Sequence, residues 1–437
     1  MTDLGRAFAA LKGKQARYDL LWAYYDGDHP LRYSTERLRE LFRDINARFV
    51  QNWCAVVIDA AKDRLNLDNL HLGDDQTDGD ELSRLWAESG LRLDADDALL
   101  AALVTGESFV IVWPDETGRP QGYYNDPRLC HAFYDAENPR RMTFAAKWWV
   151  GDDERRYLTL YYPDRLDYYV SSGKAENVQE PTAFQPAEPP TAPNPYGQIP
   201  VFHFRRERRA VRSELANVIS LQDAINKLLA DMMVTAEFAA FPERYAVTNA
   251  DLKNIKSAPN TIIEIPAGSD GEEETQVGQF PAADLGNYLE AIDRLASSMA
   301  IITRTPKHFF FAQGGDPSGE ALIAMEAPLT KKCRDLIERF TPVWEDVGRF
   351  LLRVAQRPAD GATVTAEWED VETVQPRASA EIDQIRRQIA VLDHQLGASK
   401  QTLLTKLGYD AAKEAQQREA ESEELGDELL GRFDRGE

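Results

Sequence analysis

The chain is poor in cysteine, and its three cysteines, Cys54, Cys130 and Cys333, lie far apart. An odd, scattered set is neither a disulfide framework nor a CxxC metal pair, and it is typical of a protein kept in a reducing compartment. The sequence also lacks an apolar run long enough to cross a bilayer, and its first residues lack the apolar stretch of a signal peptide. We therefore expect neither a membrane span nor a secretion signal.

Positive charge is in deficit. The 437 residues include 50 Lys and Arg against 73 Asp and Glu, which gives a formal net charge of −23. Such a balance argues against a protein that holds nucleic acid on a broad basic surface, because phosphate binding needs cations at the contact. It is still compatible with a local basic patch, or with a protein that DNA slides past.

Catalytic and metal-binding signatures are absent as well. The sequence contains no GxxxxGK[ST], GxSxG or HExxH motif, and no two of its histidines have the i,i+4 spacing of a helical metal pair. Asp94, Asp96 and Asp97 form a carboxylate cluster, which fits the start of a helix, where negative charge offsets the helix dipole. We expect no enzyme, no cofactor and no metal, with an enzyme that uses Asp94–Asp97 as a minor alternative.

The first half of the chain reads as helices followed by strands. Apolar residues at three- and four-residue spacing predict helices over 1–26, 38–65, 80–89 and 94–105. Runs rich in β-branched and aromatic residues predict strands at 108–113, 143–150, 157–162, 166–170 and 199–204. The interval 108–170 is therefore predicted to be a small antiparallel sheet packed on helices.

A proline-rich stretch separates these strands from the second half. Seven prolines fall between positions 174 and 200. Proline lacks a backbone donor and fixes φ, so we predict a semi-rigid loop at 174–197 rather than a core element.

Two long amphipathic helices are predicted in the centre, at 213–240 and 284–303. The first would be a rod of roughly 42 Å. Between them, the sequence of 243–282 predicts a compact insert with three short strands. The two long helices would then hold this small insert at their end. The apolar face of each helix fits either an ordinary core or a stalk in which identical neighbouring subunits cover these faces.

The remainder of the chain is mainly helical. A helix over 317–356 should be kinked at Pro328 and Pro342, a strand follows at 363–369, and helices cover 378–430 before an acidic tail. The overall class is mixed α+β, mainly α-helical.

Two basic segments are candidate sites. The first is an arginine cluster after the 199–204 strand, formed by Arg205, Arg206, Arg208, Arg209 and Arg212. Three interpretations stay open for it: a solvated face, ion pairs at a subunit interface, or a phosphate-contacting patch. The second is the loop 304–316, which mixes cations, aromatics and glycines.

Four segments carry a resemblance to a known family. They are Tyr24–His29, Asn194–Phe204, Ser213–Asn226 and Gly315–Leu322. In this order they resemble the portal proteins of tailed bacteriophages, specifically the large family of long-tailed phages, over residues 15–420.

The resemblance implies a portal fold assembled as a ring, typically a dodecamer, at one capsid vertex. It maps the chain as a wing (1–212), two stem helices (213–240 and 284–303), a clip (241–283), a tunnel loop (304–316), a kinked wing helix and strand (317–377), and a crown with an acidic tail (378–437). Double-stranded DNA would pass the central channel without sequence specificity, during packaging and ejection.

Partners follow from the same resemblance. The clip would dock the terminase large subunit and later a head-completion or adaptor protein, while major capsid and scaffold proteins surround the ring. The protein would belong to the virion, and to the host cytoplasm during assembly. The rival interpretation is a monomeric or dimeric cytosolic scaffold or adaptor protein without a DNA channel.

Within the tunnel loop, Lys307 is the main candidate for contact with DNA, and Arg304 and His308 are weaker ones. A negative protein with a few lumen cations would position DNA without gripping it. The alternative is that this loop only packs against its neighbour. The aromatic residues Phe309–Phe311 are expected to anchor the base of the loop.

Overall fold

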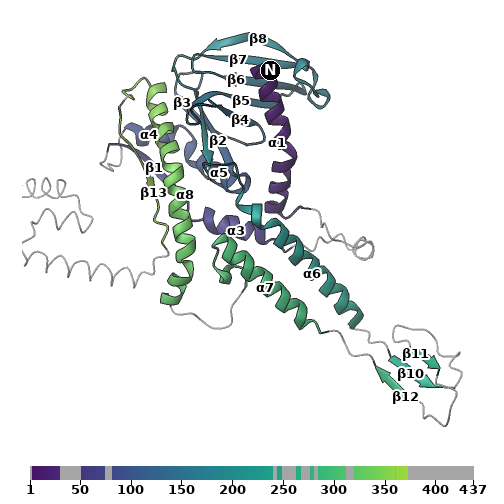
Figure 1. Cartoon of the computed structure of the whole chain (residues 1–437). Coiled ribbons are helices and arrows are strands. Elements are labelled where there is room, and N and C mark those ends of the chain that lie inside the picture. The colour runs from purple at the N-terminus through teal and green to yellow at the C-terminus, as the bar shows by residue number, and fades with distance from the viewer. Residues whose placement is uncertain are drawn as a thin grey trace, which may run out of the picture. The chain divides into compact units, whose positions relative to one another are not determined.

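Helices and small sheets alternate along the chain (Figure 1). The computed structural model describes residues 2–29, 51–73, 81–239, 244–248, 262–266, 276–279, 284–311, 319–359 and 361–372. The chain divides into two units, Met1–Val371 and Glu372–Glu437, and the fold below is that of the first. The described residues contain more helix than strand, as the sequence predicts. The predicted helices at 378–430 lie outside the described residues.

The N-terminal part is helical. Helix α1 (Asp3–Asp26) begins where the Thr2 hydroxyl accepts a hydrogen bond from the Gly5 amide at 3.2 Å, and it ends at Gly27, whose φ of 78° suits a helix C-cap. Three more helices follow: α3 (Trp53–Lys62), α4 (Glu81–Glu88) and α5 (Leu91–Thr105). All four agree with predicted helices, although the first part of the predicted 38–65 helix lies outside the described residues.

The strands form two antiparallel sheets where the sequence predicts one. The first has the order β3-β2-β9, from β3 (Pro120–Asn125), β2 (Glu107–Pro114) and β9 (Val201–Arg205). The second has the order β4-β5-β6-β7-β8, from β4 (Cys130–Tyr134), β5 (Met142–Val150), β6 (Arg155–Tyr161), β7 (Arg165–Lys174) and β8 (Phe184–Pro193). Helix α1 packs Phe8 and Leu11 into the core of the second sheet.

The proline-rich prediction needs correction, because part of that stretch is strand β8 rather than loop. Proline is tolerated there because β8 is the edge strand of its sheet, where half of the backbone N–H groups have no ladder partner to lose. Pro186 pairs with Tyr169, and Pro193 pairs with Arg165. The residues between Pro186 and Thr191 bulge out of the ladder. Before β8, two short 3₁₀ turns cover Ala175–Asn177 and Pro181–Ala183.

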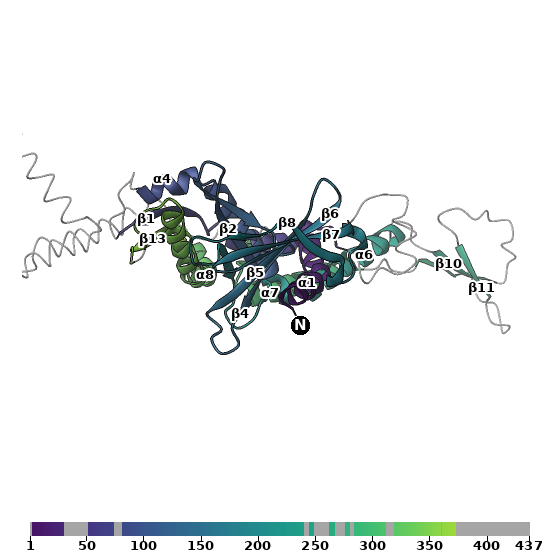
Figure 2. The same cartoon turned by 90° about the horizontal axis from the view of Figure 1, so that it is seen from above.

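One small sheet joins segments that are far apart in the sequence. Strand β1 (Leu67–Leu72) pairs antiparallel with β13 (Val364–Trp368), which is the strand predicted at 363–369. Helix α8 (Gly319–Val354) lies beside this pair in both views (Figures 1 and 2).

The two central helices are present and lie side by side (Figure 1). A 3₁₀ turn (Glu214–Asn217) capped by Ser213 precedes α6 (Ile219–Ala239), so the helix begins six residues later than predicted. Its partner is α7 (Gly286–Thr303), and the Thr235 and Tyr288 hydroxyls are 3.2 Å apart. Between them the three predicted strands are found as β10 (Arg244–Thr248), β11 (Ile262–Pro266) and β12 (Gln276–Gln279), in the order β11-β10-β12.

Helix α8 (Gly319–Val354) continues through Pro328 and Pro342. Its buried face contributes Phe340 and Trp344 to the largest core, where Trp344 meets Trp86 edge-on at a centroid distance of 5.6 Å. The residues predicted to cap this helix, Asp316 and Pro317, lie outside the described residues. All three cysteines are buried and free, and within the described ranges no helix is long and apolar enough to cross a membrane.

Candidate functional site

The segment that follows α7 is held by its own backbone. Arg304 adopts a φ of 57°, and its amide donates to the carbonyls of Ala300 and Ile301, which ends the helix. A short 3₁₀ turn at Lys307–Phe309 follows. The described part of the predicted tunnel loop, 304–311, is therefore a structured turn.

Each of the three predicted DNA-contacting cations in this segment has an acidic partner. Lys307 Nζ lies 2.9 Å from the carboxylate of Asp293 on α7, and the pair is partly exposed. Arg304 lies 3.9 Å from Asp335 of α8. His308 Nε2 lies 3.4 Å from Glu326 of α8. Carboxylates thus lie beside all three side chains, with the shortest contact at Lys307.

Helix α8 anchors this segment to the body of the subunit. Glu326 also binds Arg64 at 2.7 Å, and Lys332 bridges Glu214 at 3.2 Å and the Thr303 carbonyl at 2.8 Å. These are mostly buried charges, so both partners need each other to offset desolvation.

The aromatic residues of the segment complete the anchor. The rings of Phe310 and Phe311 meet Trp53 of α3 edge-on, at centroid distances of 5.6 and 5.0 Å. The expected anchoring role is confirmed for these two residues. Phe309 differs, because 36% of it is exposed.

The arginine cluster after β9 divides into inward and outward members. Arg206 pairs with Glu214 at 2.7 Å and donates to the Arg212 carbonyl, while the Arg205 guanidinium stacks over the Tyr134 ring at 4.9 Å. A Cβ at Gly106, whose φ is 93°, would sit 2.5 Å from the Arg212 backbone, so only glycine permits this close approach.

The outward members are Arg208, Arg209 and Arg212, which are exposed. Arg212 donates to the Asn217 side chain at 2.6 Å. Within the described residues, Arg208 and Arg209 make no ion pair. The structure thus assigns Arg206 to an ion pair within the subunit and leaves Arg208 and Arg209 available to a partner.

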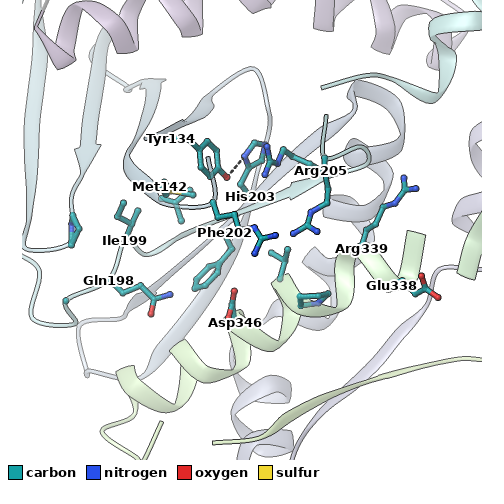
Figure 3. Close-up of a pocket in the computed structure, with 17 residues that line it drawn as sticks. Tyr134, Met142, Gln198, Ile199, Phe202, His203, Arg205, Glu338, Arg339 and Asp346 are labelled. Atoms are coloured by element: carbon teal, nitrogen blue, oxygen red, sulfur yellow. Dashed lines mark hydrogen bonds between the residues drawn. The ribbon is translucent and has the colours of Figure 1, made fainter. Parts of the chain in front are cut away.

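A cavity of about 590 Å³ lies between β9 and α8 (Figure 3). Four arginines from separate parts of the chain line it: Arg140, Arg205, Arg208 and Arg339. Two carboxylates, Glu338 and Asp346, also line it, and its apolar walls include Met142, Ile199 and Phe202. In Figure 3, Arg205 and Arg339 lie on the side of the cavity opposite Met142 and Ile199. We call this cavity the arginine pocket.

Only part of the arginine pocket could be found in the sequence. Arg205 and Arg208 belong to the predicted cluster, but Arg140 lies in the β4–β5 turn and Arg339 in α8. No local pattern connects residues so far apart.

Behind the pocket is a buried charge network that the sequence did not reveal. Glu107, at the start of β2, is 1% exposed. Its carboxylate accepts hydrogen bonds from the Tyr18 hydroxyl at 2.7 Å, from His203 Nε2 at 2.8 Å and from Lys14 Nζ at 3.2 Å. On its other side, His203 Nδ1 accepts from the Tyr134 hydroxyl at 3.0 Å. His203 and Tyr134 line the arginine pocket, so the network supports its wall.

Burial and partners set the protonation of these groups. Burial works to raise the pKa of Glu107, but hydrogen bonding to His203 and the charge of Lys14 outweigh it and hold that pKa well below its usual range. Burial lowers the pKa of His203. Burial, assisted by the Lys14 charge, lowers the pKa of His131 to about 4. Glu107 is therefore ionised and both histidines are neutral near pH 7.

The carboxylates at Asp94–Asp97 serve the fold. Asp94 accepts a hydrogen bond from the Tyr124 amide at 2.6 Å, and Asp96 pairs with Lys62 at 3.1 Å. Among the residues that the structure describes, no group of three or more His, Cys, Asp or Glu side chains is arranged to hold a metal ion.

Comparisons with known proteins agree on one family. The family model described as "Phage portal protein, SPP1 Gp6-like" matches residues 8–427. The portal protein of Mycobacterium phage L5 is 24% identical over 404 residues, which cover 84% of this chain and 80% of that protein. The portal protein of Mycobacterium phage D29 is 24% identical over 459 residues, which cover 95% of this chain and 90% of that protein.

Solved structures of gene transfer agent (GTA) particles are also similar. One is titled "Neck of native GTA particle computed with C12 symmetry", with a TM-score of 0.48, 12% identity, and coverage of 94% of this chain and 99% of that chain. Another is titled "Virion of native gene transfer agent (GTA) particle", with a TM-score of 0.46 and 13% identity. It covers 90% of this chain and 93% of that chain.

Proposed function

The chain belongs to the phage portal protein family, and on that premise we propose that its copies assemble into a ring at one capsid vertex, through which DNA enters and leaves. As a portal protein it is a structural component of the virion rather than an enzyme. The proposal concerns the ring, its channel and its partners.

The observation that carries the ring is the exposed apolar surface of α7, one of the two paired central helices. On α7, Leu289 is 57% exposed, Ile301 79% and Ile302 51%. Exposure of apolar side chains to water is unfavourable for an isolated helix pair. A neighbouring copy of the chain would bury this surface. A rod of 21 residues such as α6 is about 32 Å long. We infer that these rods line up around a common axis.

The segments take the following roles in this proposal. The wing is 1–212, the stem 213–240 and 284–303, the clip 241–283, the tunnel loop 304–316, the kinked wing helix and strand 317–377, and the crown with its acidic tail 378–437. Support comes from the order of elements, in which two adjacent rods flank a small sheet. The clip would dock the terminase large subunit and then a head-completion or adaptor protein.

The channel would conduct duplex DNA without sequence specificity. The tunnel-loop cations Lys307, Arg304 and His308 lie beside carboxylates, so their attraction for phosphate is weakened. This arrangement fits a wall that guides DNA and releases it. Assembly would take place in the host cytoplasm, in contact with major capsid and scaffold proteins.

Negative-stain electron microscopy of the purified full chain, with a mass measurement on the same sample, tests the proposal. We expect annular particles of one subunit number. A monomer or dimer at every concentration, also when capsid and scaffold proteins are co-expressed, would contradict the ring and favour the cytosolic scaffold interpretation.

A further inference from the structure

The arginine pocket has the charge and shape to receive an acidic loop. We propose that in the ring it takes the tip of the β5–β6 hairpin, Trp149–Glu154, from the neighbouring copy of the chain. This inference rests on the proposed ring and adds the contact by which one subunit joins the next.

The pocket carries an excess of positive charge. Its four arginines face two carboxylates, and within the described residues none of the four makes an ion pair. Arg339 donates one hydrogen bond to the Arg206 carbonyl at 2.6 Å, and Arg205 stacks on Tyr134, so both guanidiniums are held in place with donors to spare. In a chain with a net charge of −23, four arginines that converge beside only two carboxylates indicate that a partner supplies further carboxylates.

The size of the pocket limits what it can hold. A volume of about 590 Å³ is within the roughly 300–1,000 Å³ of pockets that hold small ligands. It accommodates a few side chains from a loop, and neither a helix nor a nucleic-acid duplex. The apolar walls at Met142, Ile199 and Phe202 match a ligand that is partly apolar better than a bare inorganic anion.

The β5–β6 hairpin has the complementary chemistry. Its tip carries Asp152, Asp153 and Glu154, all exposed. Glu154 is engaged by Lys174, and Asp153 by the Tyr157 hydroxyl at 3.0 Å. Asp152 makes no ion pair among the described residues, which leaves its carboxylate available.

Apolar surface accompanies this acidic tip. Trp149 is 36% exposed and Val150 54% exposed. Trp149 stacks on Tyr157 at a centroid distance of 5.5 Å, and the Gly151 amide donates to the Arg155 carbonyl at 3.0 Å to close the turn. The tip is therefore a preorganised acidic and aromatic projection, which lowers the entropic cost of docking.

Position along one strand makes this pair suitable for a ring. Met142, at the start of β5, lines the arginine pocket, whereas Val150, at its end, belongs to the hairpin tip. Eight residue steps at about 3.3 Å place them roughly 26 Å apart. A subunit cannot bring its own tip to its own pocket, but a head-to-tail neighbour can, and such heterologous contacts generate a ring when the rotation between neighbours closes.

Disulfide cross-linking tests the contact in the assembled protein. A chain carrying both Asp152→Cys and Arg208→Cys should give a ladder of covalent oligomers on oxidation of the rings. A mixture of chains with one substitution each should stop at dimers. The matched control pairs Arg208→Cys with Glu116→Cys, an exposed acidic position in the β2–β3 turn, and should give no ladder. Intact rings without a ladder would overturn the inference and leave the ring itself standing.

Charge exchange provides a second measurement that does not depend on oxidation. Arg208→Glu and Asp152→Lys should each lower the yield of rings at least tenfold, and the double exchange should restore most of it. Wild-type yields from both single variants would overturn the inference. So would micromolar binding of inorganic phosphate to wild-type rings that Arg208→Glu abolishes without changing ring yield, because the pocket would then be a site for a small anion.

Discussion

At the scale of single residues, the buried carboxylate of Glu107 has more consequence for stability than any surface ion pair. Glu107→Gln removes the negative charge that compensates Lys14, whose side chain is only 10% exposed. An uncompensated buried charge costs about 3–5 kcal/mol, so the free energy of unfolding should fall by about that much. Urea denaturation at a fixed protein concentration measures the change. The exposed Glu116→Gln should stay within about 0.5 kcal/mol, and a similarly small effect of Glu107→Gln would contradict the network.

His131 predicts a pH dependence of stability. Its pKa is about 4 in the folded protein, below the ordinary value of 6.5. Between these values the unfolded chain binds a proton that folded His131 does not, so the free energy of unfolding should decrease as the pH falls from 6.5 towards 4. The full decrease is about 3 kcal/mol.

Thermal unfolding between pH 7 and 4 checks this prediction, and His131→Asn should flatten the curve over that window. Protonation of Glu107 affects the free energy of unfolding in a different, more acidic pH range. Its folded pKa is lowered, so its contribution is present above its unfolded pKa of about 4.3 and is lost only as the pH falls further. An unchanged curve in the His131→Asn variant would refute the assignment.

Lys307 offers a test that separates contact with DNA from anchoring of the loop. Lys307→Glu should leave rings intact but impair DNA packaging, because it places a second negative charge beside Asp293 and removes a cation from the proposed channel. Exchanging the pair, with Lys307→Glu and Asp293→Lys together, restores the local attraction of about 1 kcal/mol or less.

An in vitro packaging assay on both variants gives the answer. If the position of the cation matters, the exchanged pair stays impaired. Recovery by the exchange would mean that the ion pair only fixes the loop, and normal packaging by Lys307→Glu alone would remove the DNA role.

At the scale of elements, the long helices were predictable because their patterns are local and repeated. The periodic apolar positions of α1, α6, α7 and α8 identify each helix without knowledge of its partner. The strand β8 was missed because proline argues against a strand, and only its position at the sheet edge makes proline acceptable.

The candidate site was predictable in composition but not in its contacts. The loop around Lys307 and the arginines after β9 are visible as basic segments. The pairing of Lys307 with Asp293, and the meeting of Glu107 with Lys14 and His203, depend on tertiary packing across 14, 93 and 96 residues. No local spacing encodes such contacts.

The exposed face of α7 leads to an assembly prediction. Ile301→Glu should reduce ring formation at least tenfold, because a carboxylate would be buried between neighbouring copies. The subunit fold should be unaffected, since 79% of the wild-type side chain is exposed. Leu93 on α5, which is 81% exposed, is the matched control, and Leu93→Glu should assemble normally. Size-exclusion chromatography with light scattering compares them, and equal assembly of the two variants would argue against a stem interface.

At the scale of the whole molecule, charge predicts how rings meet DNA. With a net charge of −23 per subunit and paired loop cations, rings should bind duplex DNA more weakly than about 10⁻⁴ M at physiological salt, the weak end of non-specific binding. Fluorescence anisotropy with a short duplex measures this affinity. Asp293→Asn should strengthen binding by releasing Lys307 from its partner, whereas submicromolar affinity of the wild-type ring would contradict a non-adhesive wall.

The pairing of β1 with β13 also determines when the subunit can complete its fold during translation. His71 and Glu367, hydrogen-bonded across these strands at 2.7 Å, are 296 positions apart. Translation at about 5–20 residues per second puts roughly 15–60 s between their appearances. During that interval β1 has no partner strand, and for most of it α8, which completes the arginine pocket, has not been synthesised. A nascent portal subunit therefore cannot recruit a neighbour through that pocket until most of its own chain has been made.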